Sequence, residues 1–264
     1  MKIWKITTSA CFFVFLSGCI AVSTESQINY GLNHYKMGLH SQAIPPLITA
    51  ADSLEKVTPT DPRLVDVLIA LGEMAQSDKR RDLADGFFTR ALKAAESLKP
   101  QDLRLLRNSL VHLGSFYLFA HPSDALPILA RAEEISRTYD DQVLHAIDLD
   151  NLGLAYRGTK NYSRSSVLSL QALAIINSVT AGKLITRTKG VILHNLGYTE
   201  MEFEHYKEAE AHFKESLLVL RSDPINVESW RVKTVLSSYA ELLRHTGRIQ
   251  EAIEFEKQSS ANVL

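Results

Sequence analysis

The chain has 264 residues, of which 45% are hydrophobic and 22% are charged, and its formal net charge at pH 7 is -1. This balance supports a folded core and excludes intrinsic disorder, which requires low hydrophobicity and a high net charge. It also excludes a broad basic surface, so nucleic acid is not expected as a partner.

Residues 1–18 are predicted to be a secretory signal peptide. A positive start, an apolar run and a small pair before a cysteine have this layout: Lys2, Lys5, Ile6 to Leu16, and Ser17-Gly18-Cys19. The apolar run has eleven residues, which is too short to span a bilayer that needs about 20. Two alternatives stay open. One is an uncleaved signal anchor, and the other is cleavage near Ala21 to release a soluble secreted protein.

The segment Leu16-Ser17-Gly18-Cys19 resembles the lipobox of bacterial lipoproteins. The resemblance implies cleavage before Cys19 and acylation of Cys19, with chains such as palmitate. Ile20 follows the cysteine, where an Asp would mark inner-membrane retention in a Gram-negative bacterium. The resemblance therefore implies the periplasmic face of the outer membrane. Residues 19–26 would be the lipidated cysteine and a short tether, with Ile20 to Ser26 at most about 25 Å long.

From residue 27 to the end, a small residue follows an apolar one at six places spaced by 39 to 44 residues: Tyr30-Gly31, Leu71-Gly72, Leu113-Gly114, Leu152-Gly153, Leu196-Gly197 and Tyr239-Ala240. Leucine lies four residues before the small residue in every unit but the first: Leu68, Leu110, Leu149, Leu193 and Leu236, with Gln27 in the first. Offsets of -4, -1 and 0 share one face of an α-helix. Each unit is therefore predicted to begin with a helix that a neighbour approaches closely at the small residue.

A second helix is predicted in each unit, starting near the residue about twelve positions after the small one. These residues are Ala43, Ala84, Ala125, Ser165, Ala209 and Ala252. Larger residues follow at Leu47, Phe88, Leu129 and Phe213, and alanine recurs at Ala50, Ala91, Ala132 and Ala172. Spacings of four and then three again define one helical face. The sixth unit carries polar Glu256 and Ser259 instead, which suits a water-exposed end cap.

Together these columns resemble the tetratricopeptide repeat, and the period of about 42 residues resembles its kinesin-light-chain-like subtype. The resemblance covers roughly residues 27–260. It implies an all-α fold for residues 27–264, a right-handed α-solenoid of about six helical hairpins with the first helices along a concave groove. An irregular helical bundle with chance periodicity is the alternative.

Residues at offsets -3, -2, +1 and +4 from the small residue are expected to face this groove. Asn151 and Asn195 are predicted to clamp the backbone of a bound segment, because an amide donates and accepts at once. Peptide-binding tetratricopeptide proteins use asparagine at the matching place. A hydrogen bond between neighbouring repeats is the alternative. Six further groove residues are predicted: Asp150, His194, His112, Tyr198, Arg157 and Arg244. Replacing both asparagines by alanine is expected to abolish binding without lowering stability.

The sequence contains no recognisable catalytic, cofactor-binding or metal-binding motif. Both cysteines, Cys11 and Cys19, lie in the leader region, and the nine histidines lack metal-ligand spacing. Ala181-Gly182-Lys183-Leu184 has Leu where a phosphate loop needs Ser or Thr. We therefore expect a non-enzymatic adaptor without cofactor, metal or small-molecule substrate.

The expected partners are other proteins, bound through a peptide segment or helix, and the membrane, reached through the lipid anchor. The expected setting is the assembly of an envelope complex for secretion, pili, the outer membrane or the cell wall. A structural or self-assembling scaffold is one alternative. An envelope enzyme that acts on glycan or peptide crosslinks is another.

Overall fold

The computed structural model describes residues 23–180, 182–222 and 230–260, so the signal peptide and Cys19 lie outside the described residues. Within these ranges the chain forms twelve helices and no strand. The helices are α1 (Thr24–Lys36), α2 (His40–Val57), α3 (Arg63–Ser77), α4 (Arg81–Ser97), α5 (Leu103–Tyr117), α6 (Pro122–Ser136), α7 (Gln142–Gly158), α8 (Tyr162–Ser178), α9 (Lys183–Glu202), α10 (Tyr206–Arg221), α11 (Trp230–His245) and α12 (Ile249–Ser260). None of these helices has the length and apolar character that a membrane span requires.

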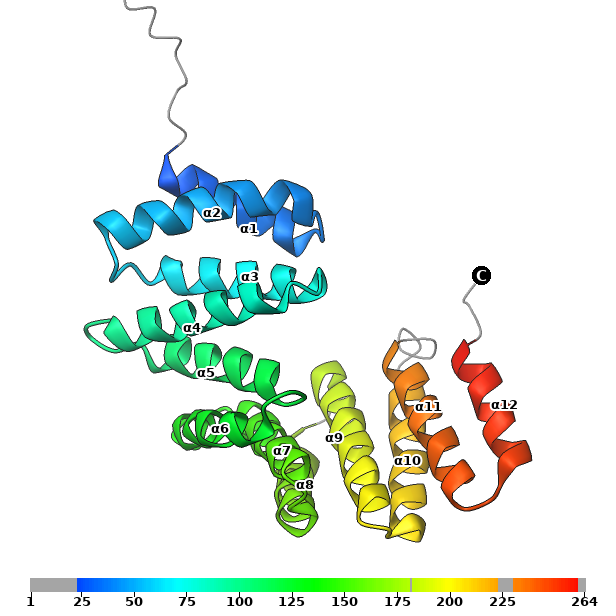
Figure 1. The fold of residues 1–264 in the computed structure, drawn as a ribbon. Coiled ribbons are helices and arrows are strands. Elements are labelled where there is room, and N and C mark those ends of the chain that lie inside the picture. The colour runs from blue at the N-terminus through cyan, green and yellow to red at the C-terminus, as the bar shows by residue number, and fades with distance from the viewer. Residues whose placement is uncertain (1–22, 181, 223–229, 261–264) are drawn as a thin grey trace, which may run out of the picture. The chain divides into compact units, whose positions relative to one another are not determined.

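Successive helices pack in pairs, from α1 with α2 to α11 with α12, so the described residues contain six helical hairpins (Figure 1). The chain divides into two compact units between Pro59 and Thr60. The first unit contains the α1–α2 hairpin, and the second contains the five hairpins from α3 to α12. The fold class is an all-α helical-repeat solenoid, which confirms the prediction from the sequence.

Each hairpin closes around the small residue of its first helix. A Cβ atom added at Gly72 would lie 2.5 Å from the Phe88 ring, and one at Gly197 would lie 2.9 Å from the Phe213 ring. The equivalent contacts in two other hairpins are Gly31 with Leu47 and Gly114 with Leu129. Real Cβ atoms do not approach other atoms this closely, so only glycine allows the second helix to lie at its observed distance.

In the second unit, the first helices of consecutive hairpins pack on one another, in the order α3, α5, α7, α9 and α11. Each second helix from α4 to α10 packs on its own partner and on the first helix of the following hairpin, as α8 does on α7 and α9. The first helices therefore form one continuous layer and the second helices cover it. This arrangement exposes one face of α7, α9 and α11 side by side.

The turn inside most hairpins has the same backbone conformation. The residue seven positions after the small residue has a positive φ in five hairpins: Gly38, Lys79, Lys160, Glu204 and Gly247. The third hairpin differs, because its connection before Pro122 is one residue shorter. The left-handed conformation lets the chain reverse direction and satisfies the last carbonyl groups of the first helix.

An ion pair that the sequence analysis did not predict joins the third and fourth hairpins. Arg107 of α5 donates Nε to one carboxylate oxygen of Asp148 on α7 at 2.7 Å and Nη2 to the other. Both side chains are buried. Burial raises the pKa of Asp148, and the Arg107 guanidinium opposes this shift. Loss of either partner would leave an uncompensated charge in the interior.

The N-terminal boundary of the folded part differs from the sequence analysis. Helix α1 begins at Thr24, and the Ser23 side chain accepts a hydrogen bond from the Ser26 backbone N–H as its N-cap. Residues 24–26, which the sequence analysis placed in the tether, are therefore helical. A serine cap satisfies a backbone donor that would otherwise lack a partner, which explains the earlier start.

The close approach at the glycine column gives a first test. Replacing Gly72 by Ala should lower the free energy of unfolding by about 1–3 kcal/mol, because the new methyl group would displace the buried Phe88 ring. Gly86→Ala is the matched control, since Gly86 lies inside α4 with no atom within 4 Å of its added Cβ. That change should raise stability by up to about 1 kcal/mol through helix propensity. Urea denaturation of both variants measures this difference, and equal shifts would contradict it.

Candidate pocket on the layer of first helices

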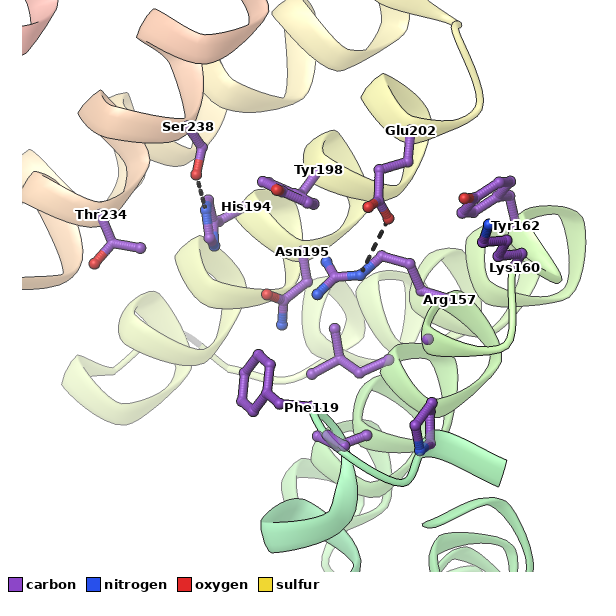
Figure 2. A pocket seen from close by; sticks show the side chains of 14 residues that line it. Phe119, Arg157, Lys160, Tyr162, His194, Asn195, Tyr198, Glu202, Thr234 and Ser238 are labelled. Carbon is purple, nitrogen blue, oxygen red and sulfur yellow. Dashed lines mark hydrogen bonds and ion pairs between the residues drawn. The ribbon is translucent and has the colours of Figure 1, made fainter. Parts of the chain in front are cut away.

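An open pocket of about 540 Å³ lies on the exposed face of α7, α9 and α11. The connection between α5 and α6 and the start of α8 complete its wall. Its lining is drawn in Figure 2 and consists of Leu118, Phe119, Pro122, Leu154, Arg157, Gly158, Lys160, Tyr162, His194, Asn195, Tyr198, Glu202, Thr234 and Ser238. Four of the eight predicted groove residues are among them: Arg157, His194, Asn195 and Tyr198.

Arg157 joins the α7 side of the pocket to the α9 side. Its guanidinium lies over the Tyr198 ring at 4.8 Å, and its Nε lies 3.6 Å from a Glu202 carboxylate oxygen. Burial raises the pKa of Glu202, and the positive charges of Arg157 and Lys160 oppose this shift. The pocket therefore places a cation, an anion and an aromatic ring next to one another, namely Arg157, Glu202 and Tyr198 (Figure 2).

Phe119 is the most exposed large apolar residue of the pocket, with 87% of its surface open to solvent. It lies in the connection between α5 and α6, and Figure 2 shows its ring at the edge of the pocket. The sequence analysis missed Phe119 because the residue lies outside the repeat columns. A solvated phenylalanine beside a pocket offers apolar area that a bound partner would bury.

Asn195 donates its Nδ2 hydrogen to a carboxylate oxygen of Asp150 at 2.7 Å. Ser169 of α8 donates to the other carboxylate oxygen at 2.8 Å, so Asp150 accepts bonds from both neighbouring helices. Burial raises the pKa of Asp150 to about 6, although the bonds from Asn195 and Ser169 and the charge of Arg157 oppose it. Of the two possibilities for Asn195, the structure contains the hydrogen bond between neighbouring repeats. Asn195 also lines the pocket.

The residues at offset -3 do not all face the groove as expected. Ile28, Ile69 and Asp150 are 3%, 6% and 4% exposed, so they are interior residues. Three residues correspond to 300° around a helix, which places offset -3 only about 60° from the small residue. In these three hairpins the position therefore turns into the packed interface, and its side chain is buried there.

His194, also at offset -3, is partly buried and still lines the pocket. Its Nε2 lies 2.9 Å from Ser238 Oγ on α11, which links the fifth and sixth hairpins. Burial, together with the charge of Arg157, lowers the pKa of His194 to about 4. The imidazole is therefore neutral at pH 7, and the pocket gains no positive charge from it.

The remaining predicted groove residues lie elsewhere. Asn151 is half-buried and does not line the pocket. His112 stacks on the Phe88 ring, with centroids 6.0 Å apart, and its Nδ1 lies 3.6 Å from Glu73. Arg244 donates to Glu256 of α12 at 2.7 and 2.9 Å. Its long side chain reaches the last helix because Glu256 stands where four of the other hairpins have Leu or Phe.

Within residues 23–180, 182–222 and 230–260, no group of three or more His, Cys, Asp or Glu side chains is arranged to hold a metal ion. The neutral His194 and the bonded Asp150 are instead explained by contacts within the protein. The pocket lining combines apolar side chains with hydrogen-bonding groups.

The two predicted asparagines should differ sharply when replaced. Asn195→Ala should lower the free energy of unfolding by about 1–3 kcal/mol, because it leaves a buried Asp150 oxygen without its donor. Asn151→Ala, the control, should change it by less than about 0.5 kcal/mol. Thermal denaturation at pH 7.5 compares the two variants. An Asn195→Ala protein as stable as the wild type would show that the bond contributes nothing. The double alanine variant is thus no longer expected to keep full stability.

Residues 191–222 match a protein-family model described as Tetratricopeptide repeat. This match spans most of α9 and α10, so the predicted resemblance is confirmed for the fifth hairpin. No curated protein matches the chain in sequence.

Solved structures match over nearly the whole chain. BtubC (BKLC) from P. vanneervenii is 15% identical, with a TM-score of 0.60 over 92% of this chain and 98% of BtubC. A Rap protein complexed with Competence and Sporulation Factor is 14% identical, with a TM-score of 0.61 over 89% of this chain and 73% of the Rap chain. PilW, a type IV pilus biogenesis factor, is 17% identical, with a TM-score of 0.63 over 90% and 93%. At these identities the likeness shows the fold.

Proposed function

We propose that this chain is a membrane-anchored adaptor that binds a segment of another protein in the pocket on α7, α9 and α11. The observation that carries the proposal is the open pocket of about 540 Å³ on the layer of first helices. The bound segment is an extended peptide or a helix, and the adaptor serves in the assembly of an envelope complex.

The composition of the pocket supports a polypeptide ligand. Phe119, Leu154 and Tyr198 provide apolar and aromatic surface from three separate elements. Asn195 and Thr234 add an amide and a hydroxyl group, which suit the donors and acceptors of a peptide backbone. Pockets that combine apolar area with a few polar groups are typical of specific binding sites.

The structural relatives also support an adaptor. One of them was solved as a Rap protein complexed with Competence and Sporulation Factor, so that protein binds a partner. Another, PilW, is described as a type IV pilus biogenesis factor. These functions belong to the relatives, and they make protein binding in envelope assembly a reasonable role for the same fold here.

The membrane anchor is the second part of the proposal. Acylation of Cys19 would attach the chain to the periplasmic face of an outer membrane. Because α1 begins at Thr24, only residues 20–23 would separate the lipidated cysteine from the first helix. Four extended residues span at most about 14 Å. The α1–α2 hairpin would therefore lie close to the lipid headgroups.

Site-specific photocrosslinking in cells tests the pocket. A photoreactive amino acid at position 119 of the full chain should form an adduct with one other protein, because the exposed Phe119 side chain borders the pocket. The matched control position is Leu218, which is 73% exposed on α10 and does not line the pocket. The adduct should be absent at position 218, and it should disappear from position 119 when Arg157 and Tyr198 are replaced by Ala.

The same cells test the anchor separately. Metabolic labelling with a palmitate analogue should mark the wild-type chain and leave a Cys19→Ser variant unmarked. An unlabelled wild-type chain would reject the anchor and leave the pocket intact as a proposal. Equal adducts at positions 119 and 218 would reject the pocket and leave the anchor intact.

A further inference from the structure

Two arginines of neighbouring first helices each have an enclosed Nε–H group that bonds to nothing in the described residues. They are Arg187 of α9 and Arg231 of α11, and both side chains are partly buried. Arg107, by contrast, donates its Nε hydrogen to Asp148. An enclosed charged donor without a partner is costly, so two of them together require an explanation.

Both arginines lie at one end of a small cavity of about 200 Å³ between α9 and α11. Val191 and Val235 line this cavity, as does Arg231 itself. Arg187 precedes Val191 by one helical turn, Arg231 precedes Val235 by one turn, and α9 contacts α11 directly. The cavity has room for a side chain and is too small for another helix.

The positive charges of the two arginines act on each other. Burial lowers the pKa of Arg231, and the charge of Arg187 lowers it further. No carboxylate in the described part of the chain contributes an opposing shift to Arg231. Two guanidinium groups in a partly dry site repel each other, and an anion bound between them would remove that repulsion.

Trp230 holds one of the two guanidinium groups in place. Its side chain lines the small cavity and is 65% exposed, and the Arg231 guanidinium lies over its ring at 4.4 Å. Stacking on an aromatic face leaves the edge of a guanidinium available to donate hydrogen bonds. That edge is the part of arginine that binds the two oxygens of a carboxylate.

We propose that Arg187 and Arg231 bind an oxyanion, supplied as the carboxylate of an acidic side chain in the partner segment. The small cavity adjoins the pocket on α7, α9 and α11, because His194, Asn195 and Thr234 line both. A segment held in the pocket would therefore place one side chain in the small cavity. The source of the carboxylate rests on the proposed function, whereas the anion site itself does not.

The fluorescence of Trp230 reports on this site directly. The full chain has two tryptophans, Trp4 and Trp230, so a Trp4→Phe background leaves a single probe. A capped peptide of three glutamates should change the emission saturably. The matching peptide of three glutamines should bind at least about tenfold more weakly, because it lacks the charge that the arginines select.

Arginine variants in the same background test the assignment. Arg187→Gln and Arg231→Gln should each weaken binding of the glutamate peptide at least about tenfold. The matched control is Arg164→Gln, since Arg164 is exposed on α8 and lines neither the pocket nor the small cavity. This control should change the affinity by less than about twofold. Thermal denaturation checks that each variant is folded, and the comparison of the two peptides on the Trp4→Phe chain needs no arginine variant.

Equal affinity for the two peptides would overturn the anion site, as would glutamate binding that neither arginine replacement weakens. Saturation by inorganic phosphate without any response to the glutamate peptide would overturn the carboxylate as its ligand. Asp223 and Glu228 lie outside the described residues, and changing them to Asn and Gln should alter the affinity by less than about twofold. A rise of about tenfold would show that these acids neutralise the arginines, and would overturn the proposal.

The result is distinguishable from that of the photocrosslinking experiment. Selective glutamate binding without an adduct at position 119 would retain the anion site and reject the partner segment as its source. An adduct at position 119 with equal affinity for the two peptides would retain the pocket and reject the anion site.

Discussion

The close approach of two helices at one small residue is the constraint on which the structure depends. At Gly72 and Gly197 the second helix brings an aromatic ring so near that no side chain fits. This contact fixes the distance between the two helices of a hairpin. The five hairpins from α3 to α12 stack with their first helices in one layer. The pocket on α7, α9 and α11 is a consequence of that alignment, because most of its lining residues lie on these three neighbouring helices.

The fourth hairpin changes this rule in a way that shapes the pocket. Ser169 stands where four other hairpins have Leu or Phe, and a Cβ at Gly153 would lie 3.2 Å from its Oγ. The smaller side chain bonds to Asp150, which in turn holds Asn195 in the pocket wall. A buried polar group is costly without partners, so this small network fixes its members in place. A polar contact therefore replaces an apolar one directly behind the pocket.

The repeat could be predicted from the sequence because its packing repeats. Leu and Gly at fixed offsets identify the first helices, and the columns of Leu47, Phe88 and Phe213 identify the residues that meet the glycines. The site was harder to predict, since helical offsets give direction only to within a fraction of a turn. Asp150 therefore lies inside the protein and Arg244 pairs with the last helix. Phe119 lies in a connection that does not repeat, so the repeat columns do not predict its place in the pocket. The Arg107–Asp148 pair joins residues 41 positions apart, so no local sequence pattern predicts it.

Hydrogen–deuterium exchange of the full chain, followed by mass spectrometry, tests most directly whether the packed hairpins present a preformed pocket. Amides protected by stable packing exchange only when the structure opens. If the glycine contacts and the Asp150 network hold the hairpins together, amides of α7 and α9 should exchange as slowly as those of α3 and α5. Rapid exchange throughout α7 and α9 in the free protein would contradict the account, because the pocket would then form only after a partner had bound.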